Sequence, residues 1–339
     1  MLSNVVVIAD WDADGVVASA QLVYVQERLG LFPVRSKILV ELIPSGPRGF
    51  REKVRGRCWD HILVVDIPFT DDVEEGLSRL SDGCKFKLYY FDHHKSTMES
   101  FSVIEKVYGG LVVTGNLPTS VLVKNFLEKH GIRITPRLRL FVEAVSVIEG
   151  GRGVTQVNER IVKIVAAISK HLNKTKDPSI WCKYVRWLAD PIPFDDIELQ
   201  LGREIPGLID ESLRVSREAD EELKEVAMRL AMSAKRVGYV RFVDARGKWS
   251  SRGASALASA IHKIVGEPVI VVVDRPDNVV LVVIRSSRGE AGRILDALYT
   301  LGLVEDKGGH ENIAVARLAK NSTLNDLEKA LQRLSPYIA

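Results

Sequence analysis

Short runs of β-branched and aliphatic residues recur along the first hundred residues, each followed by a polar turn. The runs at 5–9, 62–65 and 87–91 are typical of buried strands in a parallel sheet. Apolar residues recur at helical spacing over 15–29, and a further strand is expected near 38–40. This alternation predicts an α/β domain with a parallel sheet and helices on both faces.

The pattern changes twice further along the chain. Residues 117–188 have mainly helical periodicity, and the Glu-, Lys-, Arg- and Ala-rich stretch 210–236 predicts a long connecting helix. Strands are then expected at 239–243, 269–273, 279–284 and 312–316, with helices at 254–264 and 291–301. We therefore predict an N-terminal domain over 1–190, a linker with the long helix over 191–236, and a smaller C-terminal α/β domain over 237–339.

The composition is that of a globular protein with room for two hydrophobic cores. The chain has 339 residues, 46% hydrophobic and 27% charged, and its net charge of +3 is too small to indicate a partner. Cys58, Cys84 and Cys182 are far apart, which argues against a zinc site or a disulfide framework and predicts reduced cysteines. No basic leader precedes an apolar segment, and no apolar run nears the ~18 residues that span a bilayer. We expect a cytoplasmic protein without membrane contact.

Acidic residues and histidines follow three of the predicted strands. They are Asp10, Asp12 and Asp14 after the first, Asp66 after the second, and Asp92, His93 and His94 after the third. Because the carboxyl ends of parallel strands meet at one edge of a sheet, these side chains are expected to converge. A single Asp-rich turn is also typical of a helix cap, but three such ends favour a Mn²⁺ or Mg²⁺ site with oxygen and imidazole ligands.

These residues resemble successive motifs of the DHH phosphoesterase family, and the aromatic Trp11 between the first two acids is closest to its RecJ branch. The resemblance implies hydrolysis of phosphodiester or phosphoanhydride bonds with two bridged metal ions. We expect Mn²⁺, with Mg²⁺ or Co²⁺ as alternatives. By this resemblance Asp12 and Asp14 each bind one metal, Asp66 bridges both, and His93 is a further ligand. The catalytic side chains near the scissile phosphate are then expected to be His94, Asp92 and Asp10.

One position departs from the family pattern. The fourth motif carries a metal-binding aspartate after an apolar helix, and the matching stretch 144–151 offers Glu149 instead. Glutamate is a competent ligand, but its extra methylene moves the carboxylate oxygen by more than about an ångström. This substitution could correspond to an altered metal preference, to a slow enzyme, or to a degenerate site that is kept only for binding. Because the other motif residues are present, the sequence favours an active enzyme with Glu149 as a metal ligand.

A second group of candidate residues lies near the C-terminus. Gly308 and Gly309 permit close backbone approach to an anion, and His310 adds a directed donor. This triplet resembles the loop of the substrate-binding domain that accompanies DHH domains, and Arg285 matches that domain's arginine at a strand end. The resemblance implies that Arg285 and His310 hold a nucleotide phosphate or base, with Arg288 as a third residue.

The predicted function is a RecJ-like exonuclease on single-stranded DNA or RNA. The basic segment 48–57, Arg152 and Trp249 are candidates for a nucleic-acid groove, although charge runs such as 48–57 are also typical of solvated surface. A nanoRNase or nucleotide phosphatase acting on short oligonucleotides is one alternative. A catalytically silent RecJ homologue of the replisome is the other. Besides single-stranded DNA, RNA or short oligonucleotides, a replication or repair protein is an expected partner.

Overall fold

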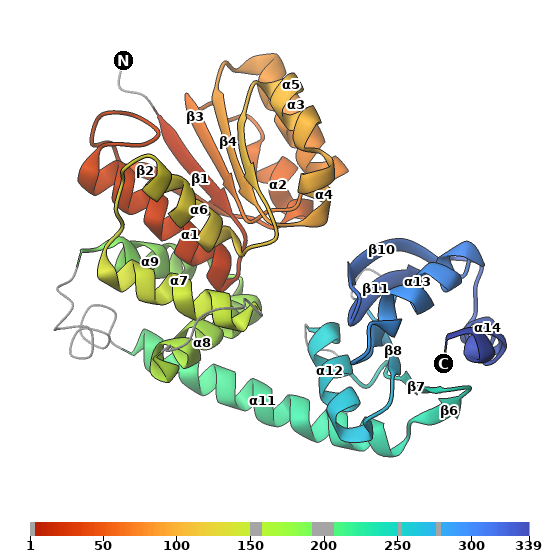
Figure 1. The fold of residues 1–339 in the computed structure, drawn as a ribbon. Coiled ribbons are helices and arrows are strands. Elements are labelled where there is room, and N and C mark those ends of the chain that lie inside the picture. The colour runs from red at the N-terminus through yellow and green to blue at the C-terminus, as the bar shows by residue number, and fades with distance from the viewer. Residues whose placement is uncertain (1–3, 150–157, 192–206, 250–252, 276–278, 339) are drawn as a thin grey trace. The chain divides into compact units, whose positions relative to one another are not determined.

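The computed structural model describes residues 4–149, 158–191, 207–249, 253–275 and 279–338 (Figure 1). The chain forms two compact units, Met1–Ser216 and Arg217–Ala339. The boundary falls inside α11 (Leu208–Met232), the long helix predicted for residues 210–236. The predicted start of the linker, after residue 190, borders residues 192–206, which lie outside the described ranges.

The first unit contains a five-stranded parallel sheet in the order β2-β1-β3-β4-β5. Its strands are β1 (Val5–Ala9), β2 (Val40–Pro44), β3 (His61–Val65), β4 (Lys87–Asp92) and β5 (Leu111–Thr114). Its helices are α1 (Ala13–Val23), π-helical η1 (Tyr24–Leu29), α2 (Pro47–Val54), α3 (Asp71–Gly83), α4 (Lys95–Glu99), α5 (Phe101–Tyr108), α6 (Thr119–Lys129), α7 (Pro136–Ile148), α8 (Glu159–Thr175) and α9 (Pro178–Ala189).

Both faces of this sheet are buried, which explains the uninterrupted apolar runs. Alternate β1 residues point to opposite faces: Val5 and Val7 join a core with α1, α6, α7, α8 and α9, whereas Val6 and Ile8 join a second core with α2 and α3. Figure 1 shows α1 and α6 on one side of the sheet and α3 on the other. The predicted parallel sheet with helices on both faces is confirmed.

The second unit contains a mixed sheet of six strands in the order β10-β11-β9-β8-β7-β6. Its strands are β6 (Lys235–Val237), β7 (Val240–Asp244), β8 (Val269–Asp274), β9 (Val280–Arg285), β10 (Val304–His310) and β11 (Ile313–Leu318). Its helices are α12 (Ala254–Val265), α13 (Glu290–Thr300) and α14 (Leu324–Ile338). Helix α12 packs on one face of the sheet and α13 and α14 on the other, which confirms a smaller α/β domain.

Three local expectations are wrong. Strand β2 spans Val40–Pro44 rather than residues 38–40, and Leu39, which precedes it, is 80% exposed. Helix α6 is preceded by Pro118 at its N-cap, so Thr119 is its first residue and not its cap. The Gly308-Gly309 pair lies in strand β10 rather than in a loop.

The expectation that all three cysteines stay reduced is also wrong. Cys58 and Cys84 form a disulfide, with their Cα atoms 5.7 Å apart, and Cys182 is free. Cys58 precedes β3 and Cys84 precedes β4, so the bond links the amino-terminal ends of two neighbouring strands. The sequence separation of 26 conceals this pairing, because only the parallel sheet brings the two strand starts together.

Candidate metal centre

The acids and histidines after β1, β3 and β4 lie at one edge of the first sheet. These three strands are neighbours and run parallel, so their carboxyl ends are adjacent. Strand β2 lies on one side of β1, and β3, β4 and β5 lie on the other, so the strand order reverses direction between β1 and β3. Open α/β sheets bind their ligands at such a switch point. The structure therefore brings the seven predicted residues of this region to the edge that suits a ligand.

Asp66 lies in the middle of the group. Its side chain is buried, and one of its oxygens lies 3.6 Å from His93 Nε2. One ligand atom each of Asp66, His93 and His94 lies within 4.8 Å of the others. The backbone of Asp66 has a φ of 58°, a left-handed conformation that Asp and Asn adopt more readily than most residues. This conformation lets the chain turn directly after β3 while the carboxyl group stays in the cluster.

The N-terminus of α6 binds two of the acids. The backbone N–H groups of Thr119 and Ser120 donate to Asp14 over 2.7 and 2.8 Å, and the Thr119 hydroxyl donates to Asp66 over 2.7 Å. These contacts use N–H groups that the first turn of a helix leaves without partners, and the helix dipole favours the negative charge. Thr119 is thus a positioning residue that sequence reasoning missed, because it lies 105 positions from Asp14.

The turn after β1 depends on a close backbone approach. Asp12 is the N-cap of α1 and accepts a hydrogen bond from the Gly15 N–H over 3.0 Å. A Cβ atom on Gly15 would lie 2.6 Å from the carbonyl oxygen of Asp10. Only glycine fits there, so Gly15 is what allows Asp10, Asp12 and Asp14 to follow one another at the end of the strand.

Asp92 orients His94. Asp92 is fully buried, and its Oδ1 lies 2.8 Å from His94 Nδ1, while its Oδ2 accepts hydrogen bonds from the His94 N–H and the Thr97 hydroxyl. The carboxylate thus holds the imidazole at Nδ1 and leaves Nε2 for another partner. Burial lowers the pKa of His94, but the hydrogen bond and charge of Asp92 outweigh it and the net shift is upward.

The carboxyl groups repel one another in the metal-free protein. Burial and the charge of Asp12 raise the pKa of Asp10 and of Asp14 to about 7. Burial, followed by the charges of its four acidic neighbours, raises the pKa of Asp66 well above its ordinary value. A divalent cation bound among these groups would replace the lost hydration and offset the repulsion. Buried oxygens beside imidazoles fit the preferences of Mn²⁺ and related ions, so the donor set fits the expected cofactor.

Glu149 lies at the C-cap of α7, with an exposed side chain. Desolvation and the charges of Asp12 and Asp14 raise its pKa, while His93 and His94 act in the opposite direction. The glutamate therefore interacts with the same cluster from the α7 side.

The second predicted group is in the second unit. Arg285 ends β9, and across the sheet it is paired with Ile313 of β11, which is paired in turn with His310 of β10. Arg285 Nη1 donates to the carbonyl of Asn312 over 2.9 Å, and the Asn312 side chain accepts from the Gly289 N–H. The structure thus places Arg285 and the Gly308-Gly309-His310 stretch at the same end of this sheet, near the start of α13.

Gly309 has a conformation that glycine alone tolerates well. Its φ is 108°, and a Cβ atom there would lie 2.2 Å from the carbonyl oxygen of Ile313. Arg288 is exposed in the turn before α13, where its N–H donates to the Glu290 carboxylate. The tight β10-β11 hairpin is therefore sufficient to explain the glycine at position 309.

Other candidates for a nucleic-acid groove are weaker. In the basic segment 48–57, Arg51 pairs with Glu75 and Arg57 with Glu41, as expected for a charge-balanced surface. Trp249 is only 8% exposed and belongs to the core of the second unit, so it offers no stacking face. Arg152 lies outside the described residues.

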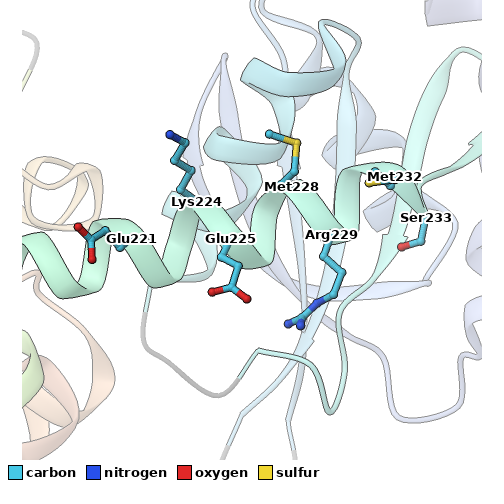
Figure 2. A pocket seen from close by; sticks show the side chains of 7 residues that line it. All are labelled: Glu221, Lys224, Glu225, Met228, Arg229, Met232 and Ser233. Carbon is cyan, nitrogen blue, oxygen red and sulfur yellow. The ribbon is translucent and has the colours of Figure 1, made fainter.

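A hollow of about 700 Å³ lies along α11. Figure 2 shows its lining side chains, all from this helix and the residue that follows it: Glu221, Lys224, Glu225, Met228, Arg229, Met232 and Ser233. Met228 and Met232 are 46% and 85% exposed, so the hollow is an open helix surface. It contains none of the predicted site residues, and the acid cluster remains the candidate centre.

Comparison with known proteins identifies the fold. No protein-family model matches the sequence, and no curated protein matches it. RecJ from Thermus thermophilus, solved with Mn²⁺, matches with a TM-score of 0.66 at 15% identity, over 99% of this chain and 52% of that one. The chain has the RecJ fold. It spans about half the length of the Thermus RecJ, so the likeness concerns only that part of the larger protein.

Two further structures share the RecJ fold. An exonuclease RecJ bound to manganese has a TM-score of 0.64 at 16% identity, with 99% of this chain and 91% of that chain covered. A pGpG-specific phosphodiesterase, PggH from Vibrio cholerae, has a TM-score of 0.59 at 12% identity, with 99% and 100% covered. These likenesses confirm the two-domain α/β architecture over nearly the whole chain.

No helix within the described ranges is long and apolar enough to cross a bilayer.

Replacing Thr119 with valine is expected to weaken Mn²⁺ binding about 10- to 100-fold, the usual effect of removing a group that orients a metal ligand. Valine keeps the β-branched shape but cannot donate to Asp66, while its backbone N–H still serves Asp14. Calorimetric titration with Mn²⁺ measures the change. Thr114→Val is the matched control, because the Thr114 hydroxyl has no hydrogen-bond partner among the described residues. Equal affinities for both variants would contradict this role of Thr119.

Proposed function

We propose that this protein is a metal-dependent phosphodiesterase that hydrolyses single-stranded nucleic acid, acting as a RecJ-like exonuclease. The observation that carries the proposal is the convergence of three strand ends into one desolvated cluster of carboxylates and imidazoles at the switch point of the sheet. The RecJ fold supports it, because known proteins of this fold include an exonuclease bound to manganese and a phosphodiesterase.

The metal ligands in this proposal come from the acid cluster and its rim. They are Asp12, Asp14, Asp66, His93 and Glu149. We assign Mn²⁺ as the ion, with two ions bound and with Mg²⁺ or Co²⁺ as alternatives. RecJ structures with Mn²⁺ and with Mg²⁺ support a divalent ion. Such ions supply a hydroxide nucleophile at neutral pH and neutralise charge on the phosphate.

The protein's own groups bind and orient the scissile phosphate. In its imidazolium form, which the charge of Asp92 favours, His94 donates from Nδ1 to Asp92 and from Nε2 to a phosphoryl oxygen. The α6 N-terminus fixes Asp14 and Asp66 before substrate arrives, so no reorganisation of these acids is needed. Asp10 completes the negative cluster next to His94, whose pKa it raises.

The second unit supplies a binding element for nucleotide phosphate or base. We assign this role to Arg285, Arg288, Gly308, Gly309 and His310. Arg285, Ile313 and His310 are cross-strand neighbours on β9, β11 and β10, close to the start of α13. This placement supports the assignment, because a guanidinium group and the free N–H groups of a helix N-terminus both bind anions.

Short oligonucleotides are the second candidate substrate. The pGpG-specific phosphodiesterase of Vibrio cholerae is covered along 100% of its length, whereas the Thermus RecJ extends well beyond this chain. The RecJ fold shared with this chain therefore accounts for the whole length of a phosphodiesterase that is named for a dinucleotide substrate. The length dependence of hydrolysis separates the two candidates.

The test is hydrolysis of end-labelled single-stranded DNA and RNA, from dinucleotides to strands of about 30 nucleotides, with Mn²⁺ or Mg²⁺. An exonuclease releases mononucleotides from all lengths, and it has a lower KM for long strands because they make more contacts with the protein. A rate that falls steeply above a few nucleotides identifies an oligonucleotide-specific enzyme. Binding of strands or of a replication or repair protein without any hydrolysis would indicate the catalytically silent homologue.

A further inference from the structure

One stretch of chain, residues 169–181, holds the acid-bearing turn after β1 from the side of α8 and α9. The Ser169 hydroxyl accepts a hydrogen bond from the backbone N–H of Ala13 over 2.8 Å. The indole N–H of Trp181 donates to the backbone carbonyl of Asp10 over 3.0 Å. Both ends of this stretch are therefore fixed against the turn that carries the acids.

Between these two contacts, Lys176 brings a positive charge to the same turn. Its ammonium nitrogen lies 5.2 Å from the centre of the Trp11 ring, within cation–π range, and 2.9 Å from the Asn173 side-chain oxygen. Trp11 stands between Asp10 and Asp12 in the chain. The ammonium also lowers the pKa of Asp10, against the larger raising effects of burial and of Asp12.

The backbone at Lys176 is in a conformation that favours glycine. Lys176 is the C-cap of α8 with φ 47° and ψ 36°, in the left-handed region. Elsewhere in this unit, the left-handed C-caps of η1 and α5 are Gly30 and Gly109. A lysine here costs stability that glycine would not, and such strained positions in folded proteins gather at binding sites.

We propose that Lys176 binds a phosphate of the nucleic-acid strand beside the acid cluster. A cluster of carboxylates repels a polyanion, and an ammonium group at its rim offsets that repulsion where the strand enters. The Trp11 ring and the Asn173 side chain position this ammonium next to the acid-bearing turn. The lysine is a compact charge on a flexible stem, which suits a phosphate oxygen. This inference rests on the proposed function, because it assumes a nucleic-acid substrate.

Lys176→Gly separates this role from a structural one. Glycine relieves the left-handed strain, so the melting temperature is expected to rise by roughly 2 °C, whereas strand affinity is expected to fall about tenfold. The affinity is measured by fluorescence anisotropy in Mn²⁺, with a labelled phosphorothioate strand of about 12 nucleotides that resists hydrolysis. The slope of log affinity against log salt is expected to decrease by about 0.7, the share of one phosphate contact.

Two further variants complete the experiment. Lys176→Gln removes the charge without introducing glycine, so it is expected to show the same loss of affinity and salt slope without stabilisation. Lys174→Gln, in the last turn of α8, makes the same change of net charge and is expected to bind as the wild type does. In hydrolysis, Lys176→Gln is expected to raise KM about tenfold and leave kcat unchanged.

Wild-type affinity and salt slope in both Lys176 variants would overturn the inference, as would an equal loss in Lys174→Gln. If the wild type neither binds nor cleaves any strand, the proposed function fails and the phosphate contact fails with it. If the wild type cleaves and the Lys176 variants bind as tightly as it does, the proposed function stands and only the phosphate contact is overturned.

Discussion

Asp66→Asn is expected to abolish phosphodiester hydrolysis while it stabilises the metal-free protein. Asparagine adopts the left-handed backbone of this position and can still accept the Thr119 hydroxyl, so the local structure is preserved. It replaces a buried carboxyl group whose ionisation is disfavoured by burial and by the neighbouring acids, so the metal-free fold no longer has to take up a proton there and is more stable at neutral pH. It also removes one of the proposed metal ligands. We expect kcat/KM to fall at least about a thousandfold, or ~4 kcal/mol of transition-state stabilisation.

The two effects of Asp66→Asn are measured separately. Hydrolysis of a labelled strand in Mn²⁺ gives the loss of activity, and thermal melting in EDTA and in Mn²⁺ gives the stability. The wild type is expected to melt at a higher temperature with Mn²⁺ than without it, and the variant to lose that difference. Asp82→Asn, an exposed position on α3, is the control and should match the wild type in both assays. Unreduced hydrolysis in Asp66→Asn would show that the reaction does not use this cluster.

Gly15→Ala is expected to damage both the fold and the activity. The new methyl carbon would lie 2.6 Å from the Asp10 carbonyl oxygen and 3.1 Å from its carbonyl carbon, and backbone atoms cannot turn away as a side chain does. Either α1 or the end of β1 must shift, at an expected cost of ~1–3 kcal/mol in unfolding free energy. A displacement of the acids by about 1 Å is expected to lower kcat/KM at least a hundredfold.

Gly83→Ala is the matched control for this substitution. Gly83 is the last residue of α3, and a Cβ atom there meets nothing within 4 Å among the described residues. Alanine is the better helix former, so this variant is expected to gain up to ~1 kcal/mol in unfolding free energy. Denaturant titration of both variants measures the change in unfolding free energy, which is expected to be a loss for Gly15→Ala and a gain for Gly83→Ala. If Gly15→Ala also stabilised the protein and left hydrolysis intact, the close approach of α1 to β1 would not be needed for the site.

The sequence predicted the parts of the site that follow from strand periodicity. Residues 62–65 and 87–91 form buried strands because their apolar runs fit a sheet covered on both faces, and Asp66 and Asp92 follow where those runs stop. Parallel pairing then places these acids at one edge, together with Asp12 after β1. The apolar periodicity of the strands, together with the rule that the carboxyl ends of parallel strands meet at one edge, was therefore sufficient to predict that these acids lie together.

The contacts that support the cluster were not predictable in the same way. Thr119 binds Asp14 and Asp66 only because α6 packs against α1, and no local pattern encodes that packing. The Cys58–Cys84 bond depends on two strand starts that meet only in the folded sheet. The resemblance to a family loop predicts a loop at Gly308 and Gly309, but they lie in strand β10, where the β10-β11 hairpin accommodates the positive φ of Gly309.

The central claim is that the acid cluster binds divalent metal ions. The most direct measurement is anomalous X-ray diffraction at the manganese edge from crystals of the wild type grown with Mn²⁺. We predict anomalous peaks in contact with the carboxylates of Asp12, Asp14 and Asp66 and with the imidazole of His93, and their loss in crystals of Asp66→Asn. If crystals saturated with Mn²⁺ gave no anomalous peak at this edge of the sheet, or gave manganese peaks only elsewhere in the chain, the acid cluster would not be a metal site.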